Sequence, residues 1–165
     1  MAETRVLPAF KLHRPFRFYD PEVVAVLTLL LGLFQMLLGF PVYYMSTSIK
    51  MLYMCPVFVG AAHVTVGSFA LACERNPSKH LMKSCLYSVF FGLLVGISAI
   101  AVYSYALDDI KSMETCSPDE MYSCPKAKFV DYFCSITALL LVYDMAALIL
   151  QGFLSFSAIK GLKMN

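Results

Sequence analysis

The 165-residue sequence is poor in charge and contains no tryptophan. Charged side chains make up 15% of it and apolar side chains 59%, whereas soluble domains average about 25% charged and about 45–50% apolar residues. The thirteen Lys and Arg residues are scattered, and the formal net charge is only +2. These values argue against a soluble domain. We also expect no nucleic-acid binding, because no basic face is present that would neutralise phosphates.

The sequence also lacks the patterns of several other classes of membrane protein. It has no Cys-x-x-Cys pair for thiol redox chemistry. Its apolar segments contain no paired carboxylates, no nucleophile beside a base and no metal-binding cluster. The Cys-Cys-Gly sequence of tetraspanins and the tryptophan of claudins are both missing. We therefore expect a protein that is not an enzyme and needs no cofactor.

Long apolar runs dominate what the sequence does contain. A transmembrane helix needs about 20 mostly apolar residues, because it crosses roughly 30 Å of hydrocarbon. Runs that meet this condition cover about 23–49, 55–73, 84–107 and 132–159. Stretches of consecutive apolar residues such as 139–142 lack the alternation of apolar and polar residues that is typical of transmembrane β-barrel strands. The sequence therefore predicts an all-α polytopic membrane protein, a bundle of four transmembrane helices over 23–159 that is surrounded by the lipid bilayer.

The basic residues predict the orientation of the bundle in the membrane. Lys and Arg near span ends favour the cytosolic side of a membrane. Nine of the thirteen lie in the N-terminal tail, the loop after the second span and the C-terminal tail, and four lie on the opposite side. We therefore expect cytosolic tails at 1–22 and 160–165, and a large outer loop at 108–131.

Four cysteines lie on the predicted outer side. Cys116 and Cys124 share the large outer loop, where an oxidising environment would let them close a small ring. Cys55 and Cys134 lie at the outer ends of the second and fourth spans, so three pairings of the four thiols exist. We favour a disulfide between Cys116 and Cys124 because both are in the exposed loop.

Two further cysteines, Cys73 and Cys85, flank the predicted cytosolic turn. Cysteines beside a membrane can be palmitoylated. Alternatively, both are small apolar residues that pack at helix ends. The sequence leaves these two interpretations open.

Small residues mark the helix faces that we expect to meet other helices, because they allow close backbone approach in a membrane. The third span has a ridge of small residues spaced by four, which either packs inside the monomer or contacts another subunit. The first and second spans have similar faces. The predicted packing or oligomer residues are Gly32, Gln35, Gly39, Gly60, Gly67, Ser88, Gly92 and Gly96.

Polar residues inside the spans are costly in lipid, and we expect them to face inward. Asp144 lies near the middle of the fourth span, and Gln151 lies seven residues later on the same stripe. His63 is the only histidine within a span. His63 and Gln35 match Asp144 in depth, which makes them its expected partners. We favour a structural hydrogen bond between helices over a proton relay or a metal site. A metal site is disfavoured because a lone histidine supplies one ligand where zinc needs about four.

Three stretches resemble a known family, the membrane-spanning four-domains subfamily A. Residues 31–39 are similar to its Leu-Gly-x-x-Gln-(Ile/Met)-x-x-Gly signature. Gly67-Ser68 resembles its Gly-Ser pair, and residues 74–83 resemble its Glu-Lys-x-Pro-(Thr/Ser)-Lys turn with the Leu-x-(Lys/Arg) that follows. The matching turn residues are Glu74, Arg75, Pro77, Lys79 and Lys83. Four spans and a cysteine pair in the second outer loop complete the likeness, which covers about 24–160.

The resemblance implies a function that composition alone does not. Relatives include the B-lymphocyte surface antigen and the beta chain of the high-affinity IgE receptor. By this likeness we expect a multi-pass protein of the plasma membrane that forms homo- or hetero-oligomers. It would associate with surface receptors and modulate their trafficking or signalling, including calcium signalling. The alternative is an ion channel or proton-coupled transporter that uses Asp144, His63 and Gln35.

Overall fold

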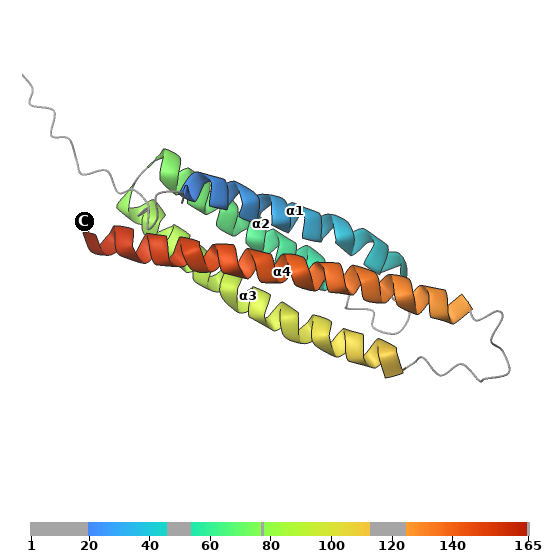
Figure 1. Cartoon of the computed structure of the whole chain (residues 1–165). Coiled ribbons are helices and arrows are strands. Elements are labelled where there is room, and N and C mark those ends of the chain that lie inside the picture. The colour runs from blue at the N-terminus through green and yellow to red at the C-terminus, as the bar shows by residue number, and fades with distance from the viewer. Residues whose placement is uncertain (1–19, 46–53, 77, 113–124, 165) are drawn as a thin grey trace, which may run out of the picture.

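The structure, a computed structural model, describes residues 20–45, 54–76, 78–112 and 125–164. Helix α1 comprises Pro21–Met45, α2 Met54–Arg75, α3 Lys79–Ser112 and α4 Pro125–Met164. The four helices run alongside one another as an elongated bundle (Figure 1). Each contains a segment long and apolar enough to cross a membrane. The all-α, four-span fold predicted from the sequence is confirmed.

The third and fourth helices are longer than the apolar runs that predicted them. The 40 residues of α4 span about 60 Å at about 1.5 Å per residue, roughly twice the hydrocarbon thickness. Helix α3 continues to Ser112 and α4 begins at Pro125. Both ends of the predicted 108–131 loop are therefore helical. Hydropathy missed these turns because polar residues can continue a helix beyond the apolar segment.

The helices form a ring in chain order. Helix α1 packs most extensively on α2, α2 packs on α3, α3 on α4, and α4 closes the ring against α1. Across the diagonals, α2 and α4 touch at a few positions, and the described parts of α1 and α3 do not touch. In Figure 1, α1 and α3 accordingly lie on opposite sides of α4. Side chains that point inward from α2 and α4 therefore meet at the centre of the bundle.

Buried positions alternate in steps of three and four along every helix. On α3 they include Met82, Cys85, Val89, Gly92, Gly96 and Ala99. On α4 they include Leu140, Asp144, Ala147, Gln151, Leu154 and Ala158. This seven-residue repeat is the pattern of helices that pack at a small angle in a left-handed bundle. The repeat places one narrow stripe of each helix inside and leaves the remaining surface for lipid.

Two apolar clusters fill the ends of the bundle. The turn-side cluster lies near the connection between α2 and α3 and comprises Ala25, Val66, Ala70, Cys73, Met82, Cys85, Val89, Leu154 and Ala158. The loop-side cluster lies at the other end and comprises Val59, Ala99, Tyr103, Ala106, Phe133, Ile136 and Leu140. The inward residues between the clusters are polar or very small.

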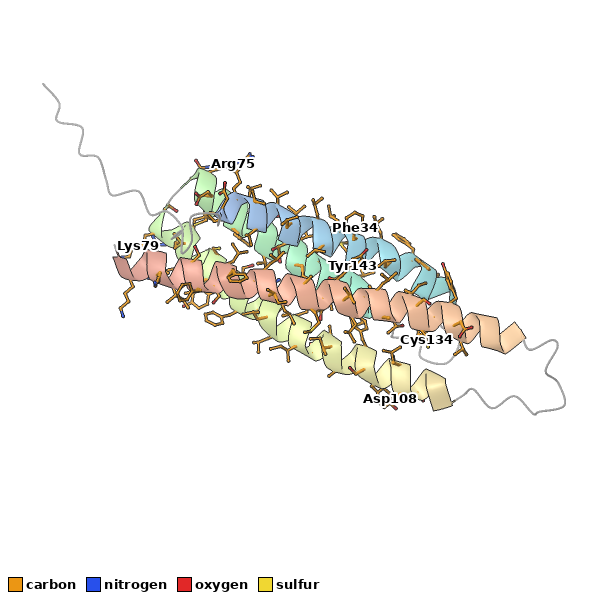
Figure 2. The ribbon with its side chains drawn as sticks, in the orientation of Figure 1. Phe34, Arg75, Lys79, Asp108, Cys134 and Tyr143 are labelled. Carbon is orange, nitrogen blue, oxygen red and sulfur yellow. The ribbon has the colours of Figure 1, made fainter. Side chains whose placement is uncertain are left out.

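The connection between α2 and α3 is tight. The backbone N–H of Leu81 donates to the Ser78 side-chain oxygen at 3.2 Å, so Ser78 caps the first turn of α3. Arg75 lies 3.9 Å from Glu22 of α1 in an exposed ion pair, which stabilises little. Lys79 is exposed, and Figure 2 shows Arg75 and Lys79 at the end of the bundle opposite Asp108 and Cys134.

The other turn residues singled out from the sequence lie in the same region. Lys83 is exposed on the first turns of α3, and Glu74 is half-buried near the end of α2. Pro77 lies outside the described residues. The exposed lysines can reach lipid head groups at this end of the bundle.

Candidate functional site

A chain of hydrogen bonds crosses the centre of the bundle between α2 and α4. The Nε2 atom of His63 lies 2.9 Å from Oδ1 of Asp144. The Nδ1 atom of the same ring lies 2.6 Å from the Gln151 amide nitrogen. All three side chains are completely buried. The imidazole therefore links two residues of α4 through both of its nitrogens.

The placement of the Gln151 amide defines the donor and acceptor of each bond. An amide nitrogen can only donate, so Nδ1 of His63 accepts from Gln151. The proton of a neutral imidazole then lies on Nε2, and Nε2–H donates to the Asp144 carboxylate. His63 thus supplies the donor that a buried carboxylate needs in a membrane.

The geometry of α4 explains why one histidine reaches both partners. Asp144 and Gln151 are seven residues apart, so they lie on the same helix face about two turns apart. Helix α2 is diagonal to α4, and the His63 ring enters between the two side chains. The pairing of His63 with Asp144 follows the sequence expectation. The bond to Gln151 was missed, although its seven-residue spacing from Asp144 placed both on one face.

Gln35 occupies the same level of the bundle but makes a different contribution. It is completely buried on α1, yet its amide oxygen and nitrogen have no hydrogen-bond partner among the described residues. It therefore makes no direct hydrogen bond to Asp144, although the sequence had suggested Gln35 as a partner of that residue. We refer to Gln35, His63, Asp144 and Gln151 together as the polar layer.

The glycines of α3 make room for the polar layer. A Cβ atom added at Gly92 would lie 2.9 Å from Oε1 of Gln151 and 2.7 Å from a methyl carbon of Val66. One added at Gly96 would lie 2.6 Å from Leu148 and 3.4 Å from Oδ1 of Asp144. The ridge of the third span therefore faces α4 of the same chain. This contact supports the monomer-packing interpretation of Gly92 and Gly96.

The glycines of α1 and α2 bring those two backbones into direct contact. A Cβ at Gly32 would lie 2.6 Å from the backbone oxygen of Gly60, and a Cβ at Gly60 would lie 2.5 Å from that of Gly32. A Cβ at Gly67 would meet the backbone oxygen of Ala25 at 2.7 Å. Small residues here allow close approach, as in other membrane helix pairs. Gly39 is also buried, whereas Ser88 on α3 is half-buried.

The cysteines of the turn belong to the turn-side cluster. Cys73 and Cys85 have no exposed surface, and the Cys73 thiol lies 3.6 Å from the Met82 sulfur as a donor. An acyl chain on either sulfur would need to displace packed side chains. The burial therefore favours the packing interpretation over palmitoylation.

We expect the burial of these thiols to be visible in chemical labelling. Treatment of the folded protein with a small maleimide, followed by peptide mass spectrometry, should leave Cys73 and Cys85 unmodified. Cys134, which is partly exposed, is the internal control and should react. Modification of Cys73 or Cys85 at the rate of Cys134, or an acyl group on either residue in protein from cells, would contradict the packing interpretation.

The cysteines of the predicted outer side divide into two groups. Cys55 and Cys134 have free thiols. Cys116 and Cys124 lie outside the described residues, so their disulfide stays a prediction. Among the described parts of the chain, no group of three or more His, Cys, Asp or Glu side chains could hold a metal ion.

Comparison with known proteins identifies one family. A sequence model described as the CD20-like family matches residues 23–159. The match includes all four residues of the polar layer and the glycines that pack around them. No curated protein and no solved structure matches the chain.

Proposed function

The chain belongs to the CD20-like family, and we propose that it is a non-enzymatic membrane protein that forms homo- or hetero-oligomers and associates with surface receptors. In this role it modulates receptor trafficking or signalling, including calcium signalling. We place it in the plasma membrane, with residues 1–22 and 160–165 in the cytosol and the loop at 108–131 outside. The family membership and the excess of basic residues in the two tails and in the connection between α2 and α3 support this orientation.

The observation that carries the proposal is that the polar layer lies between two apolar clusters. The turn-side cluster fills the bundle on one side of it and the loop-side cluster on the other. The outward faces of the described helices instead carry large apolar side chains, among them Phe40, Phe58, Leu94 and Tyr105. Surfaces of this kind suit contact with lipid or with another transmembrane helix.

The same observation weighs against the channel or transporter alternative. Such a protein needs polar groups along the whole path of the ion or proton. In the described residues, apolar clusters pack on either side of the polar layer. Buried hydroxyls outside it, such as those of Thr28 and Thr137, donate to backbone oxygens of their own helices. The arrangement therefore favours a packing role for His63 and Asp144 over conduction.

Proximity labelling in intact cells tests the proposed association. A labelling enzyme fused to the N-terminus should enrich a single-pass receptor over a control fusion to an unrelated four-span protein. Blue-native gels of the same membranes should show a complex larger than the monomer. Enrichment of no receptor together with monomers on the gel would contradict the proposal.

Variants of the outward face locate the contact. Tyr87, Leu94 and Tyr105 are the most exposed large side chains of α3, and their replacement by alanine should leave the bundle folded. A smaller complex in one of these variants assigns the interface to α3. Gly152→Ala on the open face of α4 is the matched control, because a Cβ there meets nothing within 4 Å.

A further inference from the structure

The polar layer contains more hydrogen-bonding atoms than its own bonds use. Oδ2 of Asp144, Oε1 of Gln151 and both amide atoms of Gln35 have no partner among the described residues. All three side chains are completely buried. A buried polar atom without a hydrogen bond costs about 1–3 kcal/mol, and such atoms in folded proteins are usually satisfied by protein or by internal water.

Two of these three side chains, those of Gln35 and Asp144, lie at one level of the bundle. The rings of Phe34 and Tyr143 are in contact, with centroids 6.4 Å apart, and Figure 2 shows the two residues near the middle of the bundle. Each ring belongs to the residue just before a member of the polar layer, Gln35 on α1 and Asp144 on α4. Helices α1 and α4 are neighbours in the ring. The buried amide of Gln35 and the buried carboxylate of Asp144 therefore share this level.

The contacts of His63 bring Gln151 into the same group. The His63 ring lies between Asp144 and Gln151 and forms a hydrogen bond with each. A Cβ added at Gly32, one turn before Gln35, would lie 3.0 Å from Cβ of His63. Asp144 and Gln151 thus bond to the two nitrogens of the imidazole, and Gln35 lies one turn from the α1 residue that packs against His63.

We propose that the polar layer is a binding site for internal water, which bridges Gln35 of α1 to Asp144 of α4 and also satisfies the unused oxygen of Gln151. The chemistry of the unused atoms selects water over other small ligands. Oδ2 of Asp144 and the two amide oxygens are acceptors, and the amide nitrogen of Gln35 is a donor. Water both donates and accepts, so it can satisfy atoms of both kinds. A metal cation would bind the oxygens and leave the amide donor unsatisfied.

The bridge adds a third helix to the network. His63 links α2 to α4 directly, and the water extends the hydrogen bonds to α1. The energetic role of Gln35 in this arrangement is to anchor α1 to the polar layer through solvent. Water-mediated bonds of this kind are nearly as favourable in enthalpy as direct ones.

The sequence makes this site accessible to a selective experiment. Gln35 and Gln151 are the only two glutamines of the chain. In the full-length protein labelled with ¹⁵N-glutamine and reconstituted in bilayers, solid-state NMR therefore detects two side-chain amides, both in the polar layer. Transfer of magnetisation from water protons should give a signal at the side-chain amide of Gln35. The helical backbone amides of the same two residues are internal controls and should give a much weaker signal.

Gln35→Leu and Gln151→Leu each assign the signals by removing one of them, so a single folded variant is sufficient. Absence of the water-derived signal at the Gln35 side chain would overturn the proposal and indicate a direct bond between protein groups. A shift of the side-chain signals on replacement of sodium by a large organic cation would also overturn it, in favour of a bound metal cation. Signals that are unchanged by this replacement and coupled to water support it.

Discussion

Substitution of Gly60 by alanine should strongly destabilise the bundle. The new Cβ would lie 2.5 Å from the backbone oxygen of Gly32 and 2.9 Å from the backbone nitrogen of Met36. Neither atom can move without separating α1 from α2, the most extensive helix contact of the structure. Overpacking of this kind costs about 1–3 kcal/mol, more than the gain of up to about 1 kcal/mol that alanine brings to a helix over glycine. A lower temperature of thermal unfolding in detergent is the expected result.

Gly152→Ala is the matched control for this prediction. Both substitutions add the same methyl group to a helix, but a Cβ at position 152 meets no atom within 4 Å. We expect Gly152→Ala to leave the unfolding temperature unchanged or raise it slightly. Equal unfolding temperatures for the two variants would show that α1 and α2 are further apart than the structure places them.

Replacement of Asp144 by leucine should weaken the folded state, whereas replacement by asparagine should preserve it. Leucine leaves the Nε2–H donor of His63 buried without an acceptor, which costs about 1–3 kcal/mol. The oxygen of asparagine can still accept that bond. Unfolding of the purified proteins by heat or denaturant should therefore rank Asp144→Asn near the wild type and Asp144→Leu below both.

Asp144→Leu should lower the stability of the folded protein but raise the efficiency of its insertion into the membrane. Insertion therefore needs a separate measurement. An aspartate at the helix centre costs about 2.5–3.5 kcal/mol on insertion scales, so Asp144→Leu should insert at least as well as the wild type. Expression level therefore does not replace the unfolding measurement. Equal stability of all three purified proteins would remove the His63 to Asp144 bond as a source of stability.

The fold could be predicted from the sequence because lipid imposes a simple requirement on length and polarity. Four apolar runs of sufficient length predicted four helices, and the structure has them. The helix ends were less predictable, since hydropathy marks where a helix leaves lipid and not where its backbone hydrogen bonds stop. The turns of α3 and α4 beyond the apolar runs show this difference.

The polar layer could be predicted only in part. The cost of a carboxylate in lipid indicated that Asp144 must have a partner, and depth along the spans pointed to His63. Depth could not distinguish His63 from Gln35, because the choice depends on which helices are diagonal. In the structure α2 faces α4 across the bundle centre, so His63 reaches Asp144 directly.

The sequence also could not show whether the glycine faces contact helices of the same chain or of another chain. A ridge of small residues indicates a close helix contact, but the spacing is the same for a contact within a chain and for one between chains. The structure places Gly92 and Gly96 against Leu148 and Gln151 of the same chain. Surfaces for partners must accordingly be sought on the outward faces of the helices.

A double-mutant cycle on His63 and Asp144 measures most directly whether the buried bond holds α2 and α4 together. The free energy of unfolding would be determined for the wild type, His63→Leu, Asp144→Leu and the double variant. Interhelical hydrogen bonds in membranes give coupling energies averaging about 0.6 kcal/mol, with a maximum near 1.7 kcal/mol. We expect a value in the upper part of this range, because the imidazole bonds to a buried carboxylate at 2.9 Å. Additive effects of the two single substitutions would contradict the bond between the helices.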